Sequence, residues 1–223
     1  MRLILFDIDG TLLLSGGAGT RALNRSFQLL YDLDDSMEQI QVGGRTDPDI
    51  VREVLDRRGL ELDSAANLLS TYLGFLEEEI QTSEGFRVLP GARELVVDLA
   101  QDPRFLVGVA TGNVQEGARM KLDRAGLSTY FAFGGYGSDA EDRTELIQIA
   151  ALRGTELIAP RTPEEVFVIG DTPRDISHGG QAGAKTIAVA TGSFSLDALS
   201  SHNPDLVVPA LTPAAPILDF LTS

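Results

Sequence analysis

Two aspartates separated by one residue, Asp7 and Asp9, stand where an apolar run near the start of the chain ends in a glycine turn. Side chains two residues apart leave an extended chain on the same side, so both carboxylates would face one small site beyond the strand. One carboxylate of such a pair can act as a nucleophile or metal ligand while the other transfers a proton. The spacing therefore predicts nucleophilic or acid–base chemistry at this point.

The same residues also fit a purely structural interpretation. Asp9-Gly10 lies between the apolar runs 3–8 and 11–14, which is a common signal for a tight hairpin. The two interpretations are compatible, because an aspartate at a strand end would still present its carboxylate if a hairpin followed.

Short apolar runs recur along the chain and alternate with segments of helical periodicity. This alternation predicts an α/β fold in which helices cover both faces of a parallel sheet. Helices are expected at 92–100, after Pro90-Gly91, and at 114–125, before Gly126. Strands are expected at 3–6, 105–110, 131–133, 166–169, 186–190 and 206–208.

The first two expected strands are separated by residues 7–104, whereas a crossover connection needs only about a dozen residues. Helical patterns at 23–30, 50–55 and 63–81 fill this segment. Asp47 is expected to cap the second of these helices, with Pro48 at its first position and Gly59 after its end. We therefore expect an all-helical domain of residues 15–87, inserted into a core domain of residues 1–14 and 88–223.

The composition limits the partners of the protein. The 33 acidic and 18 basic residues give a net charge of −15, which would repel a nucleic-acid polymer. A phosphate ligand would need cations placed at its own site. The chain has no cysteine and no apolar run of the roughly 20 residues that span a membrane. We expect a cytoplasmic monomer or homodimer that does not bind membranes and acts on a small molecule.

Two further polar clusters follow expected strands, where open parallel sheets place their sites. Thr111-Gly112-Asn113 offers a hydroxyl and a helix start, which suit a phosphate or serve as an ordinary helix cap. Asp171 and Asp175 follow the strand at 166–169 and, taken alone, would be a turn residue and a cap. Beside the first aspartate pair, these carboxylates would repel one another unless a divalent cation bound them, and oxygen ligands favour Mg²⁺.

A cation completes the set. Arg143 opens an expected helix, where a positive charge opposes the helix dipole unless it serves another purpose, such as contact with a phosphoryl group. In this order the motifs Asp-x-Asp-Gly-Thr, Thr-Gly-Asn, a basic residue and Gly-Asp-x-x-x-Asp resemble the four motifs of the haloacid dehalogenase superfamily. That resemblance implies a Rossmann-like parallel sheet core with a helical insertion of the C1 cap type, most similar to the phosphoglycolate phosphatases.

The resemblance also implies a role for each matching residue. Asp7 would be the nucleophile that forms an aspartyl-phosphate, and Asp9 the acid that protonates the leaving oxygen and then activates water. Arg143 would neutralise charge on the phosphoryl group. The phosphate would be bound by Thr111, Gly112, Asn113 and Arg143, and Mg²⁺ by Asp7, Asp171 and the carbonyl of Asp9, with Asp175 ligating the ion or orienting its waters.

Within the expected insertion, Arg45 follows two glycines in a loop before a helix. We expect it to contact the leaving group, although it also fits an ordinary surface arginine. Gly16-Gly17 and Gly85 flank the insertion and are candidate hinges. The chain departs from the resemblance at Leu12-Leu13-Leu14, where many of these phosphatases carry an aspartate, and in having arginine rather than lysine at 143.

These observations predict a Mg²⁺-dependent phosphatase of a small phosphomonoester, with 2-phosphoglycolate as the first candidate substrate. A sugar-phosphate mutase, a nucleotidase or a pyrophosphatase of the same superfamily remain alternatives. A phospho-accepting regulatory module is the alternative outside enzymes, but such a module would need neither Asp9 nor a large insertion. A dehalogenase would not need Asp9 or Asp171, and the insertion lacks the lysine of a phosphonate hydrolase.

Overall fold

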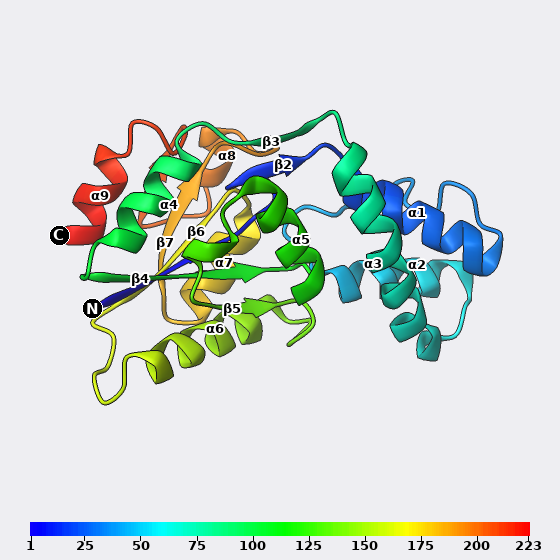
Figure 1. Ribbon diagram of the computed structural model, residues 1–223, viewed down its shortest axis with the longest axis horizontal. Helices are drawn as coiled ribbons and strands as arrows, with labels where there is room; N and C mark the ends of the chain where they lie inside the picture. The colour runs from blue at the N-terminus through cyan, green and yellow to red at the C-terminus, as the bar shows by residue number, and fades with distance from the viewer.

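The structure is a computed structural model that describes the backbone of residues 1–223 and the side chains of all of them except Ser64. Its main sheet has the strand order β5-β4-β1-β6-β7-β8, and every neighbouring pair is parallel (Figure 1). The predicted α/β fold class is confirmed. The strands are β1 (Arg2–Phe6), β4 (Phe105–Thr111), β5 (Phe133–Tyr136), β6 (Val166–Gly170), β7 (Lys185–Val189) and β8 (Leu206–Val208).

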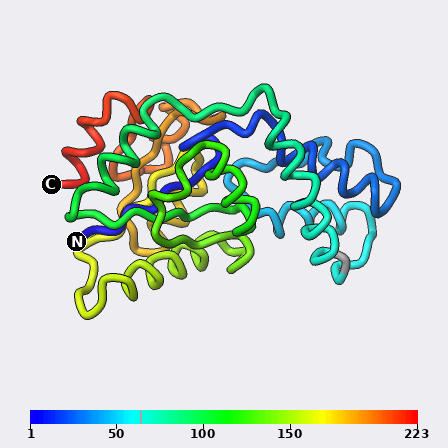
Figure 2. Tube along the Cα trace, viewed as in Figure 1, coloured from blue at the N-terminus to red at the C-terminus, as the bar shows by residue number. Residues whose placement is uncertain are grey.

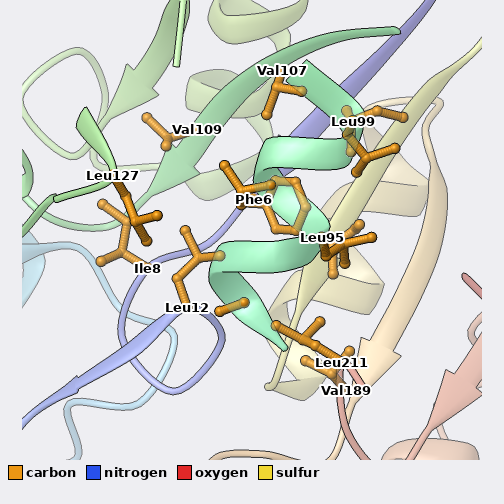
Figure 3. Close-up of a cluster of buried hydrophobic side chains, with 14 of the residues drawn as sticks. Phe6, Ile8, Leu12, Leu95, Leu99, Val107, Val109, Leu127, Val189 and Leu211 are labelled. Atoms are coloured by element: carbon orange, nitrogen blue, oxygen red, sulfur yellow. The ribbon is translucent and has the colours of Figure 1, made fainter. Parts of the chain in front are cut away.

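Helices cover both faces of this sheet, because the central strand β1 is apolar on both sides. Its residues Ile4 and Phe6 pack with α4, α5 and α9, and Figure 3 shows Phe6 beside Leu95 of α4. Leu3 and Leu5 pack on the other face against α6, next to which α7 lies. The helices are α4 (Ala92–Gln101), α5 (Gln115–Ala125), η2 (Ser128–Tyr130), α6 (Arg143–Leu157), α7 (Pro173–Gln181), α8 (Leu196–Ser200) and α9 (Ala215–Thr222).

The remaining helices form a separate layer at one end of the sheet, built from the segment between β2 (Leu13–Ser15) and β3 (Phe86–Val88) (Figure 1). This helical insertion has its own core, in which Phe27, Val51 and Tyr72 are buried. Figure 2 shows the two chain segments that join it to the sheet running side by side. Among the residues that the structure describes, no helix is both long enough and apolar enough to cross a membrane. The insertion contains α1 (Ala18–Tyr31), α2 (Asp47–Arg58), η1 (Leu62–Ser64) and α3 (Ala65–Thr82).

The strand expected at 131–133 is wrong. Residues 128–130 form η2, and the side chain of Phe131 packs against the core from the segment that follows. The strand starts at Phe133 and contains Gly134 and Gly135, where a Cβ atom would overlap Val109 and the carbonyl of Leu146. Strand β4 and helix α6 therefore come so close to β5 that only glycine fits at these two positions. Because glycine is not apolar in the sequence pattern, the apolar run that marks the other strands is absent from β5.

The hairpin suggested by Asp9-Gly10 does not form, because β2 pairs with β3 in an antiparallel ribbon rather than with β1. Gly10 has a φ of +88°, and the turn it makes directs the chain away from the main sheet. The expected cap of α2 is also wrong by one residue. The hydroxyl of Thr46 accepts the hydrogen bond from the N–H of Asp49, and Asp47 is already helical.

Candidate active site

Three of the predicted carboxylates meet where the neighbouring strands β1 and β6 end. One ligand oxygen from each of Asp7, Asp171 and Asp175 can be chosen so that all three lie within 4.8 Å of one another. The sheet fixes this arrangement, since the N–H of Asp7 donates to the carbonyl of Ile169 at 2.9 Å. All three side chains are buried, and Asp171 is packed so closely that a Cβ atom on Gly192 would overlap it.

The carboxylates of this acidic cluster repel one another when they are ionised. Burial raises the pKa of Asp171 to about 8, with further contributions from Asp175 and Asp7. Burial also raises the pKa of Asp7 to about 6, although the nearby Arg143 guanidinium opposes the shift. A divalent cation would relieve this repulsion, and buried carboxylate oxygens are the ligands that Mg²⁺ prefers. The donor set therefore fits the predicted metal.

Arg143 lies at the start of α6, as expected, and its side chain is only 4% exposed. Its Nη2 is 3.1 Å from Asp7 Oδ1 and also donates to Asp175 Oδ1. Burial alone would lower the pKa of Arg143, but Asp175 and Asp7 outweigh it and raise the value. The other oxygen of Asp175 accepts bonds from the N–H and the hydroxyl of Thr172, at 2.9 and 2.7 Å. Both oxygens of Asp175 are thus engaged, which fits an orienting role better than metal ligation.

Asp9 lies apart from the acidic cluster. Its Oδ2 accepts hydrogen bonds from Asn113 Nδ2 at 2.8 Å and from Lys121 Nζ at 2.6 Å. Burial raises the pKa of Asp9, but the charge of Lys121 and these hydrogen bonds outweigh burial, and the pKa is lowered. The Asp9 side chain is 37% exposed and lines a cavity, so a ligand there can reach it. The structure therefore places the two aspartates in different environments, Asp7 beside Arg143 and Asp9 beside Lys121.

Lys121 is a site residue that the sequence prediction missed. It lies on the buried face of α5 between Ala118 and Leu122, and its side chain is 5% exposed. The chain contains only two lysines, and this one interrupts an apolar helical stripe. A charged residue in such a stripe needs a buried partner, and this is the signal by which it could have been found.

The Thr111-Gly112-Asn113 loop follows β4 directly, beside Asp9. Thr111 Oγ1 is buried and accepts a hydrogen bond from Asn113 Nδ2 at 2.8 Å. The carbonyl of Gly112 accepts the N–H of Asp47 at 2.7 Å, and a Cβ on Gly112 would overlap the carbonyl of Arg45. The insertion therefore packs directly onto the predicted phosphate loop.

A cavity of about 550 Å³ lies between the insertion and the sheet. Arg45 lines it, but its guanidinium pairs with Asp49 and Glu53 of the insertion rather than with the acidic cluster. The cavity wall from the sheet side includes Asp7, Asp9, Thr111, Asn113, Arg143 and Asp171, and the wall from the insertion includes Thr20, Leu23, Ile50 and Tyr72.

The sequence pattern described as haloacid dehalogenase-like hydrolase matches residues 4–189. The chain belongs to the haloacid dehalogenase-like hydrolases. It is 27% identical over 216 residues to a phosphoglycolate phosphatase of Aquifex aeolicus, covering 93% of this chain and 92% of that protein. It is 25% identical over 214 residues to the pyrophosphatase PpaX of Bacillus pumilus, covering 92% and 90%. A hydrolase structure from Pseudomonas syringae matches the fold with a TM-score of 0.70 at 19% identity, covering 100% of each chain.

In this haloacid dehalogenase-like hydrolase, Asp47 connects the insertion to the core. Its environment leads us to expect that stability depends on pH. Its Oδ2 accepts the N–H of Val114 at 2.9 Å, and burial raises its pKa to about 6 against the opposing charge of Lys121. The unfolded chain ionises this group near pH 3.8 and the folded chain only near 6, so its contribution to stability falls as the pH rises between these values. Asp47→Asn removes the effect while keeping an acceptor for Val114.

At each pH, the quantity of interest is the unfolding free energy of Asp47→Asn minus that of the wild type. We expect this difference to be larger at pH 7.5 than at pH 4 by roughly 2 to 3 kcal/mol, in favour of the variant. Urea denaturation of both proteins at the two pH values measures this change. A difference between variant and wild type that is the same at both pH values would show that Asp47 titrates normally in the folded protein.

Proposed function

We propose that this protein hydrolyses a small phosphomonoester in a Mg²⁺-dependent reaction, with Asp7 as the nucleophile. The observation that carries the proposal is the placement of Asp7. Its carboxylate lines the cavity, lies within the acidic cluster and is 3.1 Å from the Arg143 guanidinium. A carboxylate next to a buried cation can approach a phosphate dianion that it would otherwise repel.

The reaction would proceed in two displacements. An oxygen of Asp7 attacks phosphorus and the bond to the leaving oxygen breaks, while Asp9 gives that oxygen a proton. Asp9 then takes a proton from water, the water oxygen attacks phosphorus, and the bond to Asp7 breaks to release phosphate. Asp9 has a lowered pKa in the ligand-free protein, which suits the second step, and the charge of a bound phosphoryl group would raise that pKa for the first.

The remaining residues would bind and neutralise the phosphoryl group. Arg143 Nε is buried without a hydrogen-bond partner among the described side chains, and a phosphoryl oxygen would satisfy such a donor. Thr111, Gly112 and Asn113 would hold other oxygens. Mg²⁺ bound by Asp7, Asp171 and the Asp9 carbonyl would supply positive charge as a Lewis acid, with Asp175 orienting this shell.

Residues 15–87 would act as a cap domain over a core of residues 1–14 and 88–223. Two observations support this division: the insertion has its own apolar core, and the joining segments are close enough that a Cβ on Gly85 would contact Gly16 Cα at 2.9 Å. The cap would select the leaving group, with Arg45 contacting it if its ion pairs to Asp49 and Glu53 exchange. The names of the relatives make 2-phosphoglycolate and pyrophosphate the first substrates to test, in a panel that includes sugar phosphates and nucleotides.

The proposed acid role predicts that Asp9→Asn depends on the leaving group. We expect a loss of about 10²-fold or more in kcat with an alkyl phosphate, whose leaving oxygen needs a proton. With 4-nitrophenyl phosphate, whose leaving group is stable as an anion, we expect a smaller loss. Steady-state assays with Mg²⁺ on both substrates measure this. Equal losses on both would exclude proton donation by Asp9, and full activity of the variant would remove it from the mechanism.

A further inference from the structure

Lys121 is a buried cation that the proposed mechanism does not use. It lies on the buried face of α5, beside Ala118 and Leu122, and its side chain is 5% exposed. Burying an ammonium group costs several kcal/mol unless close partners compensate. The second cation of the site, Arg143, already occupies the position beside Asp7, so neutralisation of the nucleophile does not explain Lys121.

The contacts of Lys121 all lead to Asp9. Its Nζ donates to Asp9 Oδ2 at 2.6 Å and to Asn113 Oδ1, while Asn113 Nδ2 donates to the same Asp9 oxygen at 2.8 Å. Asn113 Nδ2 also donates to Thr111 Oγ1 at 2.8 Å, which anchors the amide to the end of β4. Two donors that converge on one carboxylate oxygen fix the rotation of the Asp9 side chain about its Cβ–Cγ bond.

We propose that Lys121 is a positioning residue that orients Asp9 for proton transfer at the leaving oxygen. This inference rests on the proposed function, in which Asp9 is the acid and base. Lys121 lines the cavity and donates hydrogen bonds to Asp9 and Asn113, and it has none to Asp7 or Arg143. Of the groups that the proposed reaction transfers protons or phosphoryl to, Lys121 therefore contacts Asp9. A lysine with only a structural role would affect folding and all substrates alike.

The test compares Lys121→Met with wild type on an alkyl phosphate and on 4-nitrophenyl phosphate. We expect kcat to fall about 10- to 100-fold with the alkyl phosphate and less than about 3-fold with 4-nitrophenyl phosphate, the same dependence as Asp9→Asn. Lys121→Arg, which keeps the charge, should recover part of the lost activity. Lys185→Met is the matched control, since Lys185 is the only other lysine, is 41% exposed, and pairs with Glu165 from the first position of β7.

A double variant makes the test sharper. If Lys121 acts only through Asp9, adding Lys121→Met to Asp9→Asn should cause no further loss with the alkyl phosphate. Additive losses in the double variant, or equal losses of Lys121→Met on both substrates, would overturn the proposal. If Lys121→Met does not fold, the same comparisons are made with Lys121→Arg, whose altered reach should also impair the alkyl phosphate more.

The result is separable from the proposed function itself. Asp9→Asn with its own leaving-group dependence establishes the acid role independently of Lys121. If the loss in Asp9→Asn depends on the leaving group but the loss in Lys121→Met does not, only the positioning role of Lys121 is wrong. If the loss in Asp9→Asn does not depend on the leaving group, the acid role of Asp9 is wrong, and with it the premise of this inference.

Discussion

We expect Asp7→Asn to abolish turnover, with kcat at least about 10⁴-fold below wild type. An amide has nearly the volume of the carboxylate but cannot attack phosphorus, so every step after binding stops. The N–H of Asp7 that donates to Ile169 is retained, and so is a side-chain oxygen that can face Arg143. The fold should therefore be unchanged. Steady-state assays with Mg²⁺, beside circular dichroism of both proteins, measure the two outcomes.

The control for this variant is Asp102→Asn, which changes the same group in the turn after α4, where the half-buried Asp102 pairs with Arg104. It should leave turnover unchanged. Measurable turnover by Asp7→Asn, beyond what contamination or deamidation explains, would show that another group attacks the phosphate.

The second large effect concerns the metal. We expect chelation of divalent ions, or the change Asp171→Asn, to lower kcat by about 10³-fold or more, since Lewis-acid stabilisation contributes several kcal/mol. Mg²⁺ at about 100 times its Kd should stabilise the wild-type protein by about 2.7 kcal/mol. In Asp171→Asn this stabilisation should disappear, whereas the ion-free variant should melt no lower than wild type, because one of the mutually repelling carboxylates is gone.

Thermal unfolding with and without Mg²⁺, followed for both proteins, measures this prediction. Asp171→Asn preserves an oxygen that can accept from Thr11 Oγ1, which lies 3.0 Å from Asp171 Oδ1 in the wild type. Equal stabilisation of both proteins by Mg²⁺ would place the ion elsewhere. Undiminished turnover in the presence of a chelator would remove the metal from the reaction.

The sequence predicted the placement of the acidic site because it depends on strand ends. Asp7 and Asp171 follow strands whose apolar residues are evident, and parallel strands bring their carboxyl ends to one edge. The orientation of side chains was not predictable in the same way. Asp175 accepts hydrogen bonds from Thr172 and Arg143, and Arg45 pairs with Asp49 of the insertion. These side-chain rotamers depend on hydrogen bonds to neighbours that the sequence pattern does not identify.

The parts of the fold that the sequence did not predict are those set by tertiary contacts. Strand β5 contains Gly134 and Gly135 because β4 and α6 come too close for side chains, so no apolar pattern marks it. The ribbon of β2 and β3 joins segments far apart in the sequence, and Asp9-Gly10 favoured a local hairpin instead. Lys121 was missed because it lies on helix α5, whereas its partner Asp9 follows strand β1, more than 100 residues earlier in the chain.

The most direct test of the central claim is a crystal structure with Mg²⁺ and fluoroberyllate, which mimics a phosphoryl group on a carboxylate. Beryllium should be bonded to an oxygen of Asp7, and Mg²⁺ should lie about 2.0 to 2.1 Å from oxygens of Asp7 and Asp171. The fluorides should face Arg143 and the Thr111-Gly112-Asn113 loop. A structure in which Asp7 stays unbonded, or in which the ion binds away from the acidic cluster, would contradict the assignment of both nucleophile and metal.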